Sequence, residues 1–559
     1  MVQGKPISLA ETRWIFKKSA SDLLEIDRSC HLASTPLLIG VFRQNGMVGL
    51  FCWEEMVLNV SLFMTFIGVW MIAWISACIL WISRVSDRYV RLHVFLLAIP
   101  VVVSFAGLIG ADQVRETGLW RLDRTAWLMA SYIGLLGWTI QRFCIRFMHG
   151  DRSYRGYFAL LTFTTGSASV IWFSGDLRLL ALLWGLPLSG LVGLVLLNKE
   201  WTPVRHVARL MARMFAVSWF SLLLAAVWLW QVTGHWRITL ALSEELHLRL
   251  GWVNAAGIGM LVVFAAMIPA GQWPFQRWLL ESAVIPTPVS AAMHAGLVNA
   301  GGMLLARLSP LLDGGLPQWL LVVSAMVSIF VGTGILLVQP DYKRQLVAST
   351  MAQMGMMFLQ CALGAYVLAV LHLMFHGWFK AALFLSSGSI VPRTRPALLA
   401  ADPPPRRWLL YGVLSGIVLG IGFWVAEPEE PLRLLRALLI GWSLALVWWQ
   451  LAVFQSGCRT GFIIFSGLGM FAMAFHNALA SMLGDALPTA VSTGRTETAV
   501  VLLIACGGLA GLGLTARCTS EIRAKLYLWL VHLGEASDEA VESHPSYLGA
   551  YMHRGGELK

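Results

Sequence analysis

The sequence predicts an all-α, polytopic membrane protein of about 13–15 transmembrane helices, because apolar runs near the length of a spanning helix recur along most of it. Hydrophobic residues make up 57% of its 559 positions and charged residues only 13%. The mean hydropathy is +0.70. Soluble domains carry about 25% charged residues, so this chain has too few polar side chains to cover a water-facing surface of its size.

The apolar runs define where the spans are expected. Segments rich in Pro, Gly and Arg separate them, as at 396–408 and 427–431. A transmembrane domain is therefore expected over 47–516, after a polar N-terminal extension at 1–46 and before a C-terminal surface helix and tail at 517–559. The expected spans lie near 57–83, 93–111, 126–141, 157–174, 178–197, 214–231, 252–270, 288–307, 318–339, 346–368, 369–391, 408–426, 433–455, 462–483 and 496–516.

The charges between the spans predict an orientation. Basic residues follow the odd-numbered spans with few acids among them, whereas acids balance the basic residues after the even-numbered spans. Loops rich in Lys and Arg stay in the cytoplasm. We therefore expect a multi-pass protein of the cell inner (cytoplasmic) membrane with its odd-numbered loops cytoplasmic. The basic residues in question are Arg84, Arg88, Arg91, Arg142, Arg146, Arg152, Arg155, Lys199, Arg205, Arg209 and Arg213.

This orientation places the start of the first span outside the cell. Residues 1–46 would then have to cross the membrane, yet they are polar and hold no apolar core of an export signal. We therefore expect them to be an over-extended gene start, with Met47 or Met56 as the true first residue. N-terminal sequencing of the membrane-purified protein would decide this, and peptides from 1–40 would contradict it.

The composition also excludes several function classes. The net charge of +11 comes from short clusters between apolar runs rather than from one stripe with interleaved aromatics, so no nucleic-acid partner is expected. The eight cysteines form no CxxC pair, which argues against a metal site or a disulfide framework on this chain. No nucleophile–base set or phosphate loop is evident, so we expect no enzyme.

The stretch 272–308 combines a helix break with a buried imidazole. Pro286 and Pro288 lack the backbone N–H group, which predicts irregular backbone there. His294 and Asn299 follow within an apolar run, and titratable groups inside a span are functional candidates. A hydrogen-bonded packing histidine is the alternative for His294. Small residues that let another helix approach closely recur every fourth position, at Ala292, Gly296 and Ala300.

The stretch 370–389 is the most informative. His372, His376 and Lys380 follow one another at four-residue intervals, so they share one helix face with rises of about 6 Å. One intervening water can bridge that spacing. A lysine near the centre of a spanning helix costs about 2.5–3.5 kcal/mol to insert. Burial also makes an amine easier to deprotonate, which suits a proton relay. The alternative is that Lys380 reaches the headgroups from a span end.

A third stretch, 340–355, forms a junction at the membrane surface. Asp341 and Lys343 are expected on the cytoplasmic side, and Ser349 and Gln353 lie four residues apart on one helix face. Taken alone, this pattern indicates only an interfacial anchor.

Together the three stretches resemble the antiporter-like membrane subunits of respiratory complex I and of multi-subunit Na⁺/H⁺ antiporters. The matching segments are PTPVSAAMHAG (286–296), DYKRQLVASTMAQMG (341–355) and HLMFHGWFKAALFLSSGS (372–389). The resemblance implies two inverted repeats with broken helices and a polar axis along the bilayer midplane. It also places His294 and Lys380 on that axis.

Two departures narrow the resemblance. The complex I-type subunits carry a glutamate in a GWE-like motif, but the counterpart here, 178–197, has no acid between Asp176 and Glu200. Those subunits also carry a lysine near the position at which the segment 265–275 has Pro269. The first half of the predicted path has therefore lost its charged pair, while the second half keeps its lysine.

With the segment HAGLVNAGG (294–302), this pattern is similar to the DabB subunits of two-component inorganic carbon uptake systems. The resemblance implies a hetero-complex with DabA, a large zinc protein that resembles a β-carbonic anhydrase. It implies that zinc and hydration chemistry belong to that partner, and that this chain carries no cofactor. The membrane subunit would supply a cation flux, most simply of H⁺, that drives bicarbonate or CO₂ accumulation.

We therefore expect a transporter subunit with a cation path through His294, His372, His376 and Lys380. Asp341 and Lys343 are expected at its cytoplasmic mouth. One alternative is a proton-pumping subunit of an NADH–quinone oxidoreductase or a Na⁺/H⁺ antiporter complex, which would co-purify with many small membrane subunits. Another is a non-conducting anchor for a peripheral enzyme, in which Lys380→Ala would leave bicarbonate-dependent growth intact.

Overall fold

The computed structural model describes residues 46–82, 85–110, 114–243, 245, 250–312, 315–387, 414, 416–418, 420–422, 424, 425, 441, 458–483 and 520–535. The chain divides into two compact units, Met1–Val60 and Ser61–Lys559. The first unit is described only where helix α2 begins. Apart from the start of α2, all features discussed below belong to the second unit.

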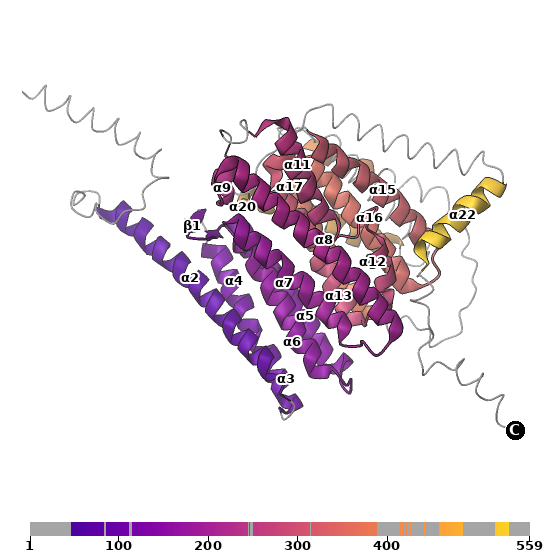
Figure 1. The fold of residues 1–559 in the computed structure, drawn as a ribbon, viewed down its shortest axis with the longest axis horizontal. Helices are drawn as coiled ribbons and strands as arrows, with labels where there is room; N and C mark the ends of the chain where they lie inside the picture. Colours follow the sequence, from indigo (N-terminus) through magenta and orange to yellow (C-terminus); the bar gives the residue numbers. More distant parts are fainter. Residues whose placement is uncertain are drawn as a thin grey trace, which may run out of the picture. The chain divides into compact units, whose positions relative to one another are not determined.

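The first part of the chain contains long helices and one short antiparallel hairpin, β1–β2 (Figure 1). Its elements are α2 (Gly46–Ile79), α3 (Asp87–Leu96), α4 (Ala98–Gly110), β1 (Arg115–Thr117), β2 (Trp120–Leu122), α5 (Arg124–Phe147), α6 (Tyr154–Val170), η1 (Ile171–Phe173), α7 (Leu177–Leu196), α8 (Thr202–Thr233) and α9 (Ile238–Ala241).

The later part contains the interrupted helices. Its elements are α11 (Gly251–Met267), α12 (Arg277–Glu281), η2 (Ser282–Val284), α13 (Thr287–Ala295), η3 (Leu297–Asn299), α14 (Ala300–Arg307), η4 (Ser309–Leu312), α15 (Leu316–Val338), α16 (Tyr342–Ala362), α17 (Tyr366–Ser386), α20 (Cys458–Leu483) and α22 (Ser520–Gly534).

Aspartates fix the starts of three helices. Asp123, Asp176 and Asp341 are the N-caps of α5, α7 and α16, and each side chain accepts a hydrogen bond from a backbone N–H in the first turn. Such caps satisfy donors that have no acceptor inside the helix. Two of these helices, α5 and α16, carry side chains of the candidate site.

Eight segments in the described part of the chain are helical, long and apolar enough to cross a membrane. This confirms the predicted all-α, polytopic membrane fold. The expected third span, 126–141, lies inside the longer helix α5. The expected spans at 433–455 and 496–516 fall outside the described residues, apart from residue 441.

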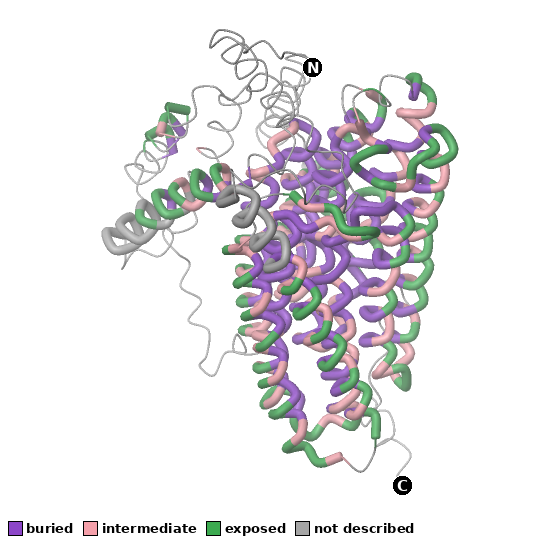
Figure 2. Tube along the Cα trace, turned by 90° about the vertical axis from the view of Figure 1, so that its left-hand side faces the viewer, coloured by how far each residue is buried: buried purple, intermediate pink, exposed green. Residues whose placement is uncertain are grey.

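The interrupted helix α13–α14 lies deepest among these segments. In its most apolar window 83% of the residues are buried, compared with 39% for Thr202–Thr233. Helix α13 packs against α5, α7 and α17, whereas α14 packs against α11, α16 and α17. In Figure 2 buried stretches follow the helix faces that meet one another, and exposed positions lie on the opposite faces.

The chain is interrupted on both sides of α13. Val284 ends η2, Ile285 is extended, and Pro286 is the N-cap of α13. Pro288 lies within the first turn of α13, where its missing N–H costs nothing, so the predicted break is confined to the residues before it. A second interruption, at Gly296–Asn299, turns the helix into the short 3₁₀ segment η3. The sequence analysis did not predict this one.

The C-terminal helix α22 crosses α15 at small residues. A Cβ atom added to Gly334 would lie 2.7 Å from Leu530, and one added to Gly534 would lie 2.8 Å from Ile335. Much of α22 is otherwise exposed. The expected tail beyond residue 535 lies outside the described residues.

Candidate functional site

The three titratable side chains of α17, His372, His376 and Lys380, form a row that we call the α17 row. Lys380 is 0% exposed and His376 is 4% exposed, while His372 is half-buried. The ring centroids of the two histidines are 6.1 Å apart, which is too far for a direct hydrogen bond. The row therefore consists of separate polar groups inside an apolar helix.

Lys380 is surrounded by neutral oxygen atoms of α16. Its Nζ donates to the carbonyl oxygen of Leu346 at 3.0 Å and to Oγ of Ser349 at 2.5 Å. The Ser349 hydroxyl in turn donates to the same carbonyl at 2.8 Å. Within the described residues no ion pair to a carboxylate accompanies these bonds. The amine is therefore buried inside the protein, and among the described residues its positive charge would be stabilised only by dipoles.

His376 is oriented by the second interruption of the broken helix. Its Nδ1 lies 3.0 Å from Oδ1 of Asn299, whose Nδ2 donates to the carbonyl oxygen of Ala295 at 2.6 Å. Since Oδ1 can only accept, Nδ1 of His376 carries the proton and Nε2 is left as an acceptor. In the part of the chain that the structure describes, that Nε2 atom is buried and has no hydrogen-bond partner.

Tyr132 of α5 connects the broken helix with α17. Its hydroxyl donates to the carbonyl oxygen of Ala295 at 3.0 Å and lies 3.3 Å from that of Leu373. The hydroxyl fits only because residue 377 is glycine. A Cβ atom on Gly377 would lie 1.5 Å from the Tyr132 hydroxyl oxygen and 2.6 Å from the Ala295 carbonyl oxygen.

The surroundings of the other two predicted histidines, His372 and His294, differ. Nδ1 of His372 lies 3.2 Å from Oε1 of Gln360 on α16. His294, on α13, is fully buried, and its ring stacks on Phe384 at a centroid distance of 4.5 Å. Neither ring nitrogen of His294 has a hydrogen-bond partner among the described residues. Buried polar atoms are normally paired, so His294 stays a candidate for the predicted cation path.

The two residues expected at the cytoplasmic mouth have different surroundings. Asp341 is exposed, and its Oδ1 accepts from the backbone N–H of Arg344 at 2.8 Å. Lys343 is half-buried, and its Nζ donates to the carbonyl oxygens of Ala283 at 3.1 Å and Ile285 at 2.6 Å. Lys343 therefore ties α16 to the irregular backbone before α13, whereas Asp341 is a helix cap.

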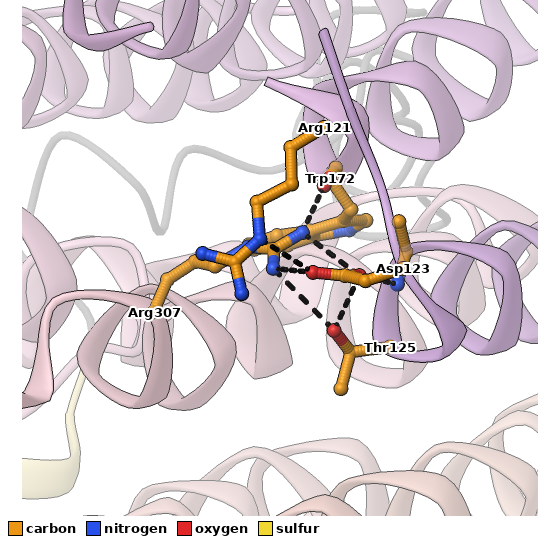
Figure 3. A network of polar contacts seen from close by, with 6 residues as sticks. Arg121, Asp123, Thr125, Trp172 and Arg307 are labelled. Atoms are coloured by element: carbon orange, nitrogen blue, oxygen red, sulfur yellow. Dashed lines mark hydrogen bonds and ion pairs between the residues drawn. The ribbon is translucent and has the colours of Figure 1, made fainter. Parts of the chain in front are cut away.

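Figure 3 shows a second group of charged side chains, centred on the buried residues Asp123 and Arg307. Arg307, at the end of α14, pairs with the carboxylate of Asp123 and donates to the carbonyl oxygen of Trp172. Arg121 also pairs with Asp123, at 2.9 Å. Burial of Asp123 raises its pKa, but Arg307 and Arg121 outweigh this effect and leave the pKa below the ordinary value of 3.8.

The sequence analysis missed Tyr132, Gln360 and this ion pair. Tyr132 and Gln360 contact α17 from other helices, and nothing in their own segments marks them. As for metals, no group of three or more His, Cys, Asp or Glu side chains in the described part of the chain could hold an ion.

Comparison with known proteins shows that the chain is similar to subunits of membrane complexes. Residues 174–400 match the family described as NADH:quinone oxidoreductase/Mrp antiporter, transmembrane. The chain is 44% identical over 488 residues to the probable inorganic carbon transporter subunit DabB of Bacillus anthracis, which covers 87% of this chain and 96% of that one. It is also 44% identical over 496 residues to the protein of the same name from Bacillus subtilis (strain 168), covering 88% and 98%.

A solved structure shares the fold. The chain superimposes on one chain of the Mrp complex from Dietzia sp. DQ12-45-1b with a TM-score of 0.59 and 19% identity. The match covers 88% of this chain and 59% of that chain, so the present protein spans little more than half of that subunit.

Proposed function

The chain belongs to the DabB family of inorganic carbon transporter subunits, and from this premise we propose that it conducts protons to drive inorganic carbon accumulation by a partner. The path runs through Lys380, His376, His372 and His294. As a subunit, the chain works within a larger complex, and the partner proposed is a DabA-like zinc protein that carries the hydration chemistry.

One observation carries the proposal: a fully buried lysine amine in the second half of α17 donates to two neutral oxygen atoms of α16. A permanently charged group in this position would need a counter-ion, because burying an unpaired charge is costly. An amine that alternates between charged and neutral forms avoids that cost for part of each cycle. Lys380 is therefore the group proposed to accept and release the transported proton at Nζ.

The histidines are proposed to pass protons along the bilayer plane. Three buried imidazole nitrogens, Nε2 of His376 and both ring nitrogens of His294, need hydrogen-bond partners. Water molecules supply such partners in polar interiors and span distances of the kind found between His372 and His376.

The proposed sidedness follows the basic loops, with the odd-numbered loops in the cytoplasm of the cell inner membrane. Lys343 and Asp341 then lie at the cytoplasmic end of α16. The Lys343 amine donates to carbonyl oxygens of the irregular backbone that precedes α13, so its proposed role is to hold this segment in place. Labelling of single cysteines introduced into the loops by an impermeant reagent tests this orientation.

The central test compares two lysines that undergo the same substitution. Lys380→Gln removes the titratable group, while Lys525→Gln changes an exposed lysine of α22 that pairs with Glu521. Both variants are expressed with the partner in a carbonic anhydrase-deficient host and assayed for uptake of labelled inorganic carbon. Lys380→Gln should reduce uptake to the level of the host without the chain, with the complex still assembled, and Lys525→Gln should retain it.

Retained uptake in Lys380→Gln would show that the chain is a membrane anchor instead. That alternative has one observation in its favour: α7 carries no acid between Asp176 and Glu200. Collapse of uptake by a protonophore but not by Na⁺ removal would identify H⁺ as the driving ion.

The partner is tested by purification through a tag on this chain. A single large co-purifying protein with bound zinc supports the proposed hetero-complex. Recovery of many small membrane subunits would instead indicate an NADH–quinone oxidoreductase or Na⁺/H⁺ antiporter complex.

A further inference from the structure

A groove with a volume of about 1230 Å³ opens where the start of α3 meets the C-terminal end of α5, and we call it the α3–α5 groove. This volume greatly exceeds the roughly 30 Å³ that one water molecule occupies in the liquid, so the groove has room for a whole molecule rather than for a single ion. Its lining comes from α3, α5 and the segment up to Tyr154. The proton path proposed above therefore makes no use of it.

Basic side chains line the α3–α5 groove. Arg91 of α3 and Arg142 and Arg146 of α5 are exposed and line it. Among the described residues of the lining, Asp87 is the only acid, and it lies 4.0 Å from Arg155. Arginine binds phosphate oxygens through paired N–H groups. The charge of the lining therefore selects an anion.

The three arginines of the groove have no carboxylate partner in the part of the chain that the structure describes. By contrast, Arg152 in the following loop pairs with Glu200 at 2.7 Å. The guanidinium of Arg142 lies over the ring of Trp138, 4.9 Å from its centroid, and this contact holds the charge at the groove. The donors of the three arginines are therefore available to a ligand.

The groove also has apolar walls that continue into an exposed apolar stripe. Phe143 and Phe147 of α5 line it beside the arginines. From Leu92, the residue after Arg91, exposed apolar side chains follow at intervals of three and four residues along the candidate membrane span Asp87–Gly110. These side chains are Leu92, Phe95, Ile99, Val102, Phe105 and Ile109. A ligand in the groove therefore meets positive charge at one end and a long apolar surface beyond it.

We propose that the α3–α5 groove binds an anionic phospholipid, with its phosphate at the three arginines and its acyl chains along the stripe on α3 and α4. A free anion would use the arginines but not the stripe, and an acidic surface of a partner protein would likewise meet only the arginines. Basic pockets between spanning helices on the cytoplasmic side bind anionic headgroups. The sidedness proposed above places this end of the span in the cytoplasmic leaflet.

The test measures how much lipid the full complex retains. The complex is reconstituted in nanodiscs of phosphatidylcholine with phosphatidylglycerol as the anionic probe, and the lipids that stay bound after detergent extraction are counted by native mass spectrometry. Wild type should retain phosphatidylglycerol in preference to phosphatidylcholine. The double variant Arg142→Gln, Arg146→Gln should lower this retention about tenfold, because two charges near the phosphate are lost.

The matched control is Arg209→Gln, Arg213→Gln, which removes two exposed arginines with the same four-residue spacing from α8. It should retain phosphatidylglycerol as wild type does. Arg91→Gln changes the opposite wall of the groove and should lower retention about threefold. This single variant decides the question if the double variant does not assemble. Unchanged retention in every groove variant that assembles, or an equal loss in the control, would overturn the proposal.

A further arm separates a lipid from a free anion. Glycerol 3-phosphate carries the phosphate without acyl chains, so an excess of it should leave the retained phosphatidylglycerol in place. Displacement would assign the groove to a free anion and overturn the lipid site. Absence of phosphatidylglycerol from the wild-type complex would overturn it as well, since the groove would then be empty or covered by the partner. These results are read as mass, without uptake, so failure of the proposed proton path would leave them unchanged.

Discussion

Two buried cations, Arg307 and Lys380, lie in this fold with opposite surroundings. Arg307 pairs with the carboxylate of Asp123 and donates to a backbone carbonyl, so its charge is balanced and its donors are used. Lys380 has a carbonyl and a hydroxyl oxygen and, among the described residues, no carboxylate in an ion pair. A balanced guanidinium fixes structure, whereas an unbalanced amine can change its charge. The difference supports a structural role for Arg307 and the transport role proposed for Lys380.

The largest effect is expected from Lys380→Arg. Arginine keeps the positive charge but does not release its proton in proteins. We expect uptake of labelled inorganic carbon to fall to the level of the host without the chain, while the complex still assembles. The reciprocal variant Arg307→Lys should keep uptake per assembled complex and lose only stability. Equal loss of uptake in both variants would remove the distinction between the two sites.

The next effect concerns Asp123→Asn, which leaves Arg307 buried without its counter-charge. Breaking a buried pair in this way costs about 3–5 kcal/mol of unfolding free energy. The matched control is Glu200→Gln, because Glu200 pairs with Arg152 and the two side chains are 77% and 85% exposed. That loss should stay near 1 kcal/mol or below, as for exposed pairs. Thermal unfolding in nanodiscs measures the stability loss of each variant. The double variant Asp123→Asn, Arg307→Met no longer has an unpaired buried charge, so it should recover part of the loss.

The sequence contained the α17 row but not its partners. The four-residue spacing of His372, His376 and Lys380 lies within one helix, where spacing alone places side chains on a common face. Tyr132 reaches Ala295 across 163 positions of the chain. Arg307 pairs with Asp123, which lies 184 positions earlier in the sequence. Such pairs depend on how helices pack, which periodicity within one segment does not encode. Likewise Pro286 marked one interruption of the broken helix, whereas the second, at Gly296–Asn299, carries no proline.

A smaller effect is expected from Gly377→Ala, which tests the contact between α17 and Tyr132. The added methyl group would overlap the Tyr132 hydroxyl oxygen, and such overpacking costs about 1–3 kcal/mol. In the control Gly68→Ala, nothing lies within 4 Å of the added atom. That helical change should be neutral or stabilising by up to about 1 kcal/mol. The cost of Gly377→Ala should fall in a Tyr132→Phe background, and strict additivity would contradict the contact.

The smallest expected effect is a pH dependence of the stability that the Asp123–Arg307 ion pair contributes. Because the pKa of Asp123 is below its ordinary value of 3.8 in the folded protein, the ion pair stabilises the fold fully above that value. The contribution is lost as pH falls through the folded pKa, since the unfolded chain then binds the proton first. We expect wild type to unfold at a higher temperature than Asp123→Asn. The difference between the two unfolding temperatures should be constant above about pH 5 and should decrease below it. A difference that persists unchanged below 3.8 would show that the carboxylate charge of Asp123 does not hold Arg307, and the contrast with Lys380 would lose its basis.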